Sequence, residues 1–241
     1  MPLVKIIYLI IISLFFTILS TTHVFAQSSE LKEAFQNTKN SFKEGKLGYA
    51  INFAKKAVEI SKEEFGKEHK ITATLIENLG TIEMDLELYK EAEISFRTST
   101  QIRKKILDAD SPEIAESMDL LAVSLRKQLF YDKAMEYHNE AILIITRALT
   151  KSNPHGINET SRKGALFRAR AMYTKALIDI KNYNHENAIG YLKTASRIFT
   201  TTLGKNKLEL KETYILMLDA ANKIKDKETI NLARSNIDKL L

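Results

Sequence analysis

The 241-residue chain carries 36 Lys and Arg against 30 Asp and Glu, a formal net charge of +6, and it contains no cysteine. The lack of cysteine excludes disulfides, thiolate metal sites and a cysteine nucleophile. Acidic and basic residues alternate along the chain, as at Lys55, Lys56 and Glu59, whereas a nucleic-acid-binding protein gathers Lys and Arg into one stripe. The composition therefore favours a solvated surface of both charge signs and not a polybasic one.

Residues 1–26 have the layout of a secretory signal peptide. Lys5 precedes the apolar stretch 6–19, and Val24-Phe25-Ala26 forms a small-residue cleavage site before Gln27. We expect cleavage after Ala26 and export of residues 27–241 to the periplasm or the medium, in a bacterium. In the alternative, residues 6–26 stay uncleaved and anchor the chain in a membrane.

Four segments share an eleven-residue pattern that begins with alanine, has a small residue at +7 and has isoleucine at +10. The alanines are Ala50, Ala92, Ala134 and Ala188. The first two intervals are 42 residues and the third is 54, which indicates a 12-residue insertion. Ile230 follows Ala188 by a further 42 residues. A period of this length indicates stacked supersecondary units.

Helical periodicity covers most of the chain, and no segment alternates with the two-residue period of a strand. Helix breakers recur with the repeat at Gly45, Gly66, Pro112, 153–156 and Gly204. A 42-residue period also fits six heptads of a coiled coil, but Pro112 would end such a helix. The sequence thus predicts an all-α fold of helix pairs.

These segments resemble the tetratricopeptide repeat, in which small residues recur between two antiparallel helices. The second repeat carries the resemblance most fully, with Ile76, Leu79, Gly80, Tyr89, Ala92 and Phe96 at the motif positions. The 42-residue length is similar to the long repeats of kinesin light chain, and 66–69 is the nearest copy of their linker. The resemblance implies a right-handed α-solenoid of about five antiparallel helix pairs, with repeats near 29–65, 66–107, 108–149, 165–203 and 204–241, and an insertion loop at 150–164.

No pattern of catalytic, metal-ligating or cofactor-binding residues emerges. The five histidines lack helical metal-ligand spacing, and phosphate loops and nucleophile elbows are missing. His138 follows Ala134 by one turn, which favours a packing role. We also expect Tyr49, Tyr89, Tyr131 and Tyr191 to be packing residues. The sequence predicts a protein that is not an enzyme and needs no cofactor or metal.

The resemblance implies a binding groove lined by the first helix of each pair, at fixed offsets before the small residue that opens the second helix. Among the predicted groove residues, we single out seven as candidates for partner binding, namely Glu77, Asp119, Arg126, Lys127, Arg170, Tyr173 and Lys181. Because the groove becomes more basic along the chain, we expect a protein or peptide partner that is acidic or bears carboxylates, with arginine as the planar donor. The rival interpretation is an ordinary solvated helix surface.

The sequence therefore predicts an exported, non-catalytic scaffold that binds a protein or peptide and no nucleic acid. Two alternatives remain open: a membrane-anchored external sensor that needs a separate output protein, and an adaptor in envelope assembly. The insertion at 150–164 is polar, so it is either a functional loop or a surface extension that costs little stability. We expect it to interrupt the superhelix between the third and fourth repeats.

Overall fold

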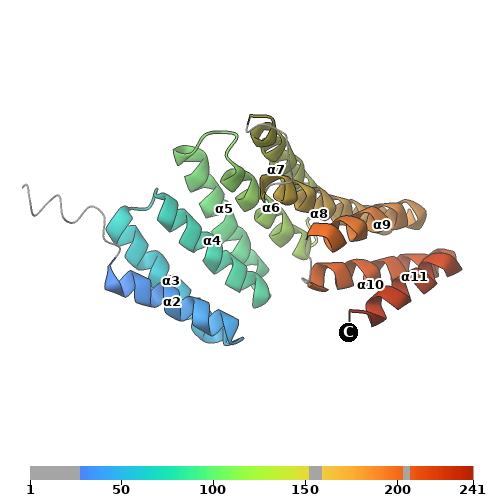
Figure 1. The fold of residues 1–241 in the computed structure, drawn as a ribbon, viewed down its shortest axis with the longest axis horizontal. Helices are drawn as coiled ribbons and strands as arrows, with labels where there is room; N and C mark the ends of the chain where they lie inside the picture. Colours follow the sequence, from blue (N-terminus) through green and yellow to red (C-terminus); the bar gives the residue numbers. More distant parts are fainter. Residues whose placement is uncertain (1–27, 152–158, 203–206, 241) are drawn as a thin grey trace, which may run out of the picture.

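A computed structural model describes residues 28–151, 159–202 and 207–240, and over these residues the chain is all-α, with five antiparallel helix pairs stacked in chain order (Figure 1). Each helix packs against the one before it and the one after it. The pairs are α2 (Ser29–Lys43) with α3 (Leu47–Phe65), α4 (Lys70–Asp85) with α5 (Tyr89–Ile106), α6 (Pro112–Lys127) with α7 (Tyr131–Lys151), α8 (Glu159–Lys181) with α9 (His185–Thr202), and α10 (Lys207–Ile224) with α11 (Lys227–Asp238). The expected solenoid of helix pairs is confirmed.

The alanines that open the second helices lie where the two helices of a pair approach each other. Ala50, Ala92, Ala134 and Ala188 are all fully buried. Small side chains at these positions allow close helix packing, and larger ones fill the remaining space. Gly80 shows how tight this packing is, because a Cβ atom added there would lie 2.8 Å from the Phe96 ring.

Every joint between the two helices of a pair has the same backbone geometry. In each joint one residue adopts a positive φ, and the next amide N–H donates to the carbonyl five residues earlier. This is the Schellman motif that ends many helices. The positive-φ residues are Gly45, Glu87, Leu129, Tyr183 and Lys225, spaced by 42 residues except for 54 between Leu129 and Tyr183. The joints therefore follow the sequence period.

The expected insertion loop at 150–164 is shorter than predicted. Helix α7 continues to Lys151 and α8 begins at Glu159, so both ends of the predicted loop are helical, while 152–158 lie outside the described residues. Gly164 is buried, and a Cβ there would lie 3.3 Å from Ile145 of α7. Part of the insertion thus lengthens α8, and this added part packs against α7.

The N-terminal segment 1–26 lies outside the described residues, so its role as a signal peptide stays a prediction. Across the described part of the chain, none of the helices combines the length and apolar character needed to cross a bilayer. The expectation for the tyrosines is wrong at Tyr49, which is 66% exposed, and Tyr191 is also exposed, at 36%. Tyr49 lies at a different position of the repeat from Tyr89 and Tyr131, which are partly buried.

Candidate protein-binding surface

The first helices of the pairs line the inner side of the curved stack. Helix α6 contacts α8 directly, and Lys127 of α6 reaches Glu212 of α10 at 2.8 Å, past the intervening pair. Side chains from every second helix in the series can meet in this way only on the concave side of a curved stack. The concave surface therefore comprises the inner faces of α2, α4, α6, α8 and α10.

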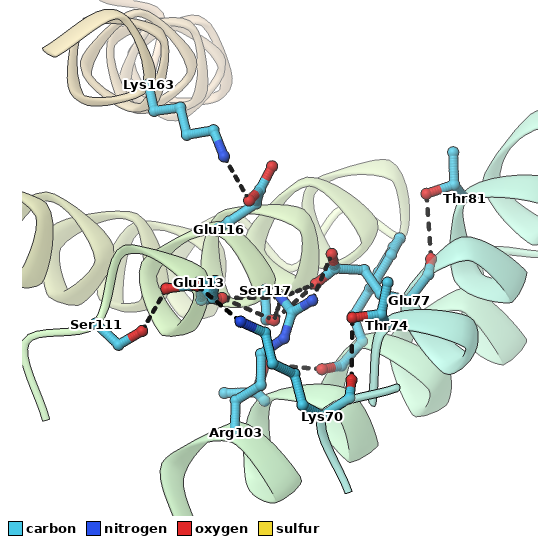
Figure 2. A network of polar contacts seen from close by, with 12 residues as sticks. Lys70, Thr74, Glu77, Thr81, Arg103, Ser111, Glu113, Glu116, Ser117 and Lys163 are labelled. Atoms are coloured by element: carbon cyan, nitrogen blue, oxygen red, sulfur yellow. Dashed lines mark hydrogen bonds and ion pairs between the residues drawn. The ribbon is translucent and has the colours of Figure 1, made fainter. Parts of the chain in front are cut away.

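A buried cluster links α4, α5 and α6 (Figure 2). Arg103 of α5 donates to the Glu77 carboxylate from two guanidinium nitrogens, at 2.5 Å and 3.1 Å, and it also donates to Ser117. Ser117 donates to Glu77 at 2.7 Å. Burial raises the pKa of Glu77, while Arg103 opposes that shift. Glu77 is thus a concave-surface residue whose charge is already compensated within the chain.

A second ion pair joins α6 to α8 beside this cluster. Lys163 of α8 donates to Glu116 of α6 at 2.8 Å, and Figure 2 shows the lysine reaching down from its helix to that carboxylate. Lys70 and Glu113 make a looser pair between α4 and α6, at 3.7 Å. Both contacts are partly exposed, so each contributes little to the stability of the fold.

A fully buried carboxylate organises the centre of the surface. Asp119 accepts from Nδ1 of His138 at 2.8 Å and from Arg170 at 2.5 Å. Arg170 also contacts Glu209 of α10 at 2.8 Å. Since an ionised carboxylate only accepts, the neutral His138 ring carries its proton on Nδ1, and its buried Nε2 has no hydrogen-bond partner in the described chain. The cluster ties α6, α7, α8 and α10 together.

The ionisation of this cluster follows from burial and from its own charges. Burial works against ionisation of Asp119, but Arg170 and His138 together hold the pKa of Asp119 below its ordinary value. Burial lowers the pKa of His138, against the pull of Asp119. Burial also disfavours the charge of Arg170, yet Asp119 and Glu209 raise its pKa. The stable arrangement is a neutral His138 beside an ionised Asp119–Arg170 pair.

Arg126 differs from every other arginine in these clusters. It is 4% exposed, and its guanidinium lies over the Tyr173 ring, 4.6 Å from the ring centre. Within the described residues it forms neither a hydrogen bond nor an ion pair, and its Nε is buried without a partner. Burial raises the pKa of Tyr173 to about 12, so the phenol stays neutral. A buried cation is normally paired with a carboxylate, whereas the contact that the structure gives the Arg126 guanidinium is the face of the Tyr173 ring.

The structure brings five of the seven predicted groove residues into one region, namely Asp119, Arg126, Lys127, Arg170 and Tyr173. Glu77 belongs to the separate cluster around Arg103. Lys181 lies exposed at the end of α8. Their binding role stays a prediction, because three of the charges in the central region already have partners inside the chain.

Sequence reasoning missed the partners of these residues. Arg103 and His138 come from second helices, which the groove offsets do not include. Glu212 occupies the first groove offset of the fifth repeat, so the same offsets applied to that repeat would have found it. Nothing in the sequence signals that α10 approaches α8 and α6, which brings Glu209 to Arg170 and Glu212 to Lys127.

The opposite end of the concave surface contains an open apolar cavity between α2 and α4. It has a volume of about 210 Å³ and is lined by Phe35, Thr38, Lys39, Phe42, Asn78, Thr81 and Ile82. Phe35 and Phe42 remain 40% and 36% exposed. In the described residues the Asn78 side chain makes no hydrogen bond, so its amide is available to a peptide backbone. The described residues contain no group of three His, Cys, Asp or Glu side chains placed to hold a metal ion.

The comparisons with known proteins agree with this architecture. Residues 71–147 match the family model of the tetratricopeptide repeat. No curated protein matches the chain by sequence. The structure is similar to the nearly identical TPR-like repeats of a kinesin light chain protein from Podosopora anserina, with a TM-score of 0.57 and 15% identity over 89% of this chain and 97% of that one.

Two further solved structures show the same fold at low identity. The apo form of RapI has a TM-score of 0.62 and 15% identity, over 91% of this chain and 73% of that one. Aspartyl phosphate phosphatase F from Bacillus subtilis has a TM-score of 0.60 and 13% identity, over 89% of this chain and 61% of that one. Residues 71–147 thus match the tetratricopeptide repeat, and the described helix pairs on either side of them share the fold of these TPR-like repeat structures.

Proposed function

We propose that this protein is an exported, non-catalytic scaffold that binds a protein or peptide partner on its concave surface. Stacked helical repeats present an extended concave face to their partners, and this chain has such a face over its described length. Export rests on the signal-like pattern of residues 1–26. A scaffold role also accords with the repeat family of residues 71–147.

The unpaired guanidinium of Arg126 carries the proposal. Arg103, Arg170 and Lys127 each have a carboxylate partner within the chain, whereas Arg126 has none among the residues that the structure describes. An incoming carboxylate would supply the opposite charge and accept hydrogen bonds from the terminal nitrogens of the guanidinium. The partner is thus expected to place an Asp, a Glu or a C-terminal carboxylate against α6 and α8.

The cavity between α2 and α4 supports the same function at the other end of the surface. Its two exposed phenyl rings suit an apolar side chain of the partner, and Asn78 offers both a donor and an acceptor to an extended backbone. An extended peptide that crosses the surface would meet an apolar contact near Phe42 and a cationic contact at Arg126.

The test uses peptides selected from a displayed random library against the purified, folded protein. We expect selected peptides to be enriched in carboxylates and to lose about tenfold or more in affinity on Arg126→Leu, which corresponds to about 1.4 kcal/mol. Leucine preserves an apolar contact with Tyr173, so the variant should fold. Arg168→Leu, on the exposed side of α8, is the matched control. Peptides that bind both variants like the wild type would refute a role for Arg126.

A further inference from the structure

Two helix joints carry large apolar side chains at positions where the backbone favours glycine. Leu129 and Tyr183 have φ values of 67° and 61°, and they are 68% and 85% exposed. The left-handed conformation is unfavourable for residues with a Cβ atom, and such exposed side chains add no packing. The equivalent residue is glycine in the first joint and charged in the second and fifth, Glu87 and Lys225. Neither the backbone nor the core explains these two residues.

A cavity lies between these two joints, on the edge of the stack. Its volume is about 340 Å³, and it is lined by Leu129, Phe130, Tyr131, Asp132, Lys133, Ile178, Lys181 and Asn182. Phe130 is 50% exposed, which adds to the apolar character of the edge. The exposed apolar side chains and the cavity thus coincide in the third and fourth repeats.

The charges at this cavity define what can occupy it. The Lys133 ammonium lies over the Phe130 ring, 5.5 Å from the ring centre. Among the described residues neither Lys133 nor Lys181 forms an ion pair, and Asp132 is the one acidic residue of the lining. Two lysines and one aspartate give the lining a net charge of +1 beside the apolar side chains of Leu129, Phe130 and Ile178, which complements an apolar side chain next to a carboxylate.

We propose that the cavity between the third and fourth joints, bounded by Leu129, Phe130 and Lys181, is a second docking site, for a protein segment that presents an apolar side chain beside an Asp or Glu. This site is separate from the concave surface and does not depend on the function proposed for Arg126. An anionic membrane is a poorer match, since Glu87, Glu91, Asp132 and Glu186 lie along the same edge and anionic lipid favours a face of one positive sign.

The glycine variants of the two joints make this proposal testable without loss of the fold. Leu129→Gly and Tyr183→Gly relieve an unfavourable backbone conformation, so reduced binding cannot be attributed to unfolding. Peptides from a displayed random library are selected on the full folded chain and counter-selected on Leu129→Gly. We expect an apolar residue beside Asp or Glu in the survivors, with affinity falling about tenfold for Leu129→Gly and again for Lys181→Glu.

Two controls separate this site from the concave surface and from other occupants. Arg126→Leu and Phe35→Asp should leave the affinity of these peptides unchanged, whichever way the concave-surface test turns out. The proposal is overturned if no selected peptide depends on Leu129. It is equally overturned if Leu129 and Tyr183 are instead needed for flotation with phosphatidylglycerol vesicles, or for self-association measured by light scattering.

Discussion

Lys127 of α6 donates a hydrogen bond to Glu212 of α10 at 2.8 Å, across 85 residues of sequence. Both side chains are about one-third exposed, so solvent and salt screen much of their attraction. The contact nevertheless links the third and fifth repeats directly, across the concave surface.

Charge reversal at either end should open this contact with a small loss of stability. For Lys127→Glu we expect the free energy of unfolding to fall by about 0.5 kcal/mol, together with an increase in the radius of gyration by small-angle X-ray scattering. The double variant Lys127→Glu/Glu212→Lys should recover both. Equal losses that simply add in the double variant would show that the two residues are not coupled.

The His138–Asp119 contact predicts a loss of stability on mild acidification. Because burial lowers the pKa of His138 from 6.5 in the native state, the unfolded chain takes up the proton first. Stability should therefore fall as the pH drops below about 6.5, with a slope that approaches about 1.4 kcal/mol per pH unit. The depressed pKa of Asp119 acts in the same direction, but only below about pH 4.

The matched variant for this prediction is His138→Asn. Its amide can still donate to Asp119, and it does not titrate, although Asp119, Arg126 and Arg170 continue to face the site. Urea unfolding at pH 7 and about pH 5 measures the difference. A variant with the same pH slope as the wild type would assign the acid sensitivity to other groups.

Removal of the unpaired cation should stabilise the free protein. Arg126→Leu removes a buried charge that has no carboxylate partner among the described residues, and a buried charge without such a partner is costly to desolvate. We expect a gain of about 1 kcal/mol in the free energy of unfolding, measured by urea denaturation. A marked loss of stability would mean that Arg126 is a structural residue and not one held ready for a partner.

The joints offer a reciprocal pair of substitutions. Leu129→Gly should raise stability by about 1 kcal/mol, since glycine adopts a positive φ without the Cβ conflict. Gly45→Leu should lower it by a similar amount, because no neighbouring atom lies within 4 Å of the added Cβ and the cost is confined to the backbone. Thermal melts of both variants measure the two shifts.

Export gives a prediction that mass spectrometry decides. If residues 1–26 are a cleaved signal peptide, the protein expressed in a bacterial host should be recovered from the periplasm with Gln27 at its N-terminus. The control is a variant with Ala26→Asp, in which the cleavage site loses its small residue. Recovery of intact chains from the membrane fraction with both proteins would favour the anchored alternative instead.

The repeat register was predictable because packing imposes it on residue type. A small side chain is required wherever two helices cross closely, so Ala50, Ala92, Ala134 and Ala188 recur with the fold. The joints were predictable in position but not in conformation. Of the five joint residues, Gly45 is the one whose type favours a positive φ, whereas Leu129 and Tyr183 are held at positive φ by the helices on either side.

The electrostatic pairing within the concave surface could not be predicted in the same way. Whether Arg170 faces a partner or an internal carboxylate depends on the curvature of the whole stack, which brings Glu209 of α10 to it. Curvature results from many small packing contacts, and no local pattern encodes it. For Arg126 the sequence indicated the correct surface, but its lack of an ion pair is visible only in three dimensions.

The identical closure of all five joints has a consequence for folding. Each hairpin forms its joint hydrogen bonds between residues five apart and packs its own two helices together, so most native contacts are short-range in sequence. Low contact order favours rapid folding, and folding in such arrays can begin at any unit and spread to its neighbours. The 12 extra residues fall between the third and fourth joints, and part of them extends α8. They therefore do not lengthen either joint that must close for a hairpin to form.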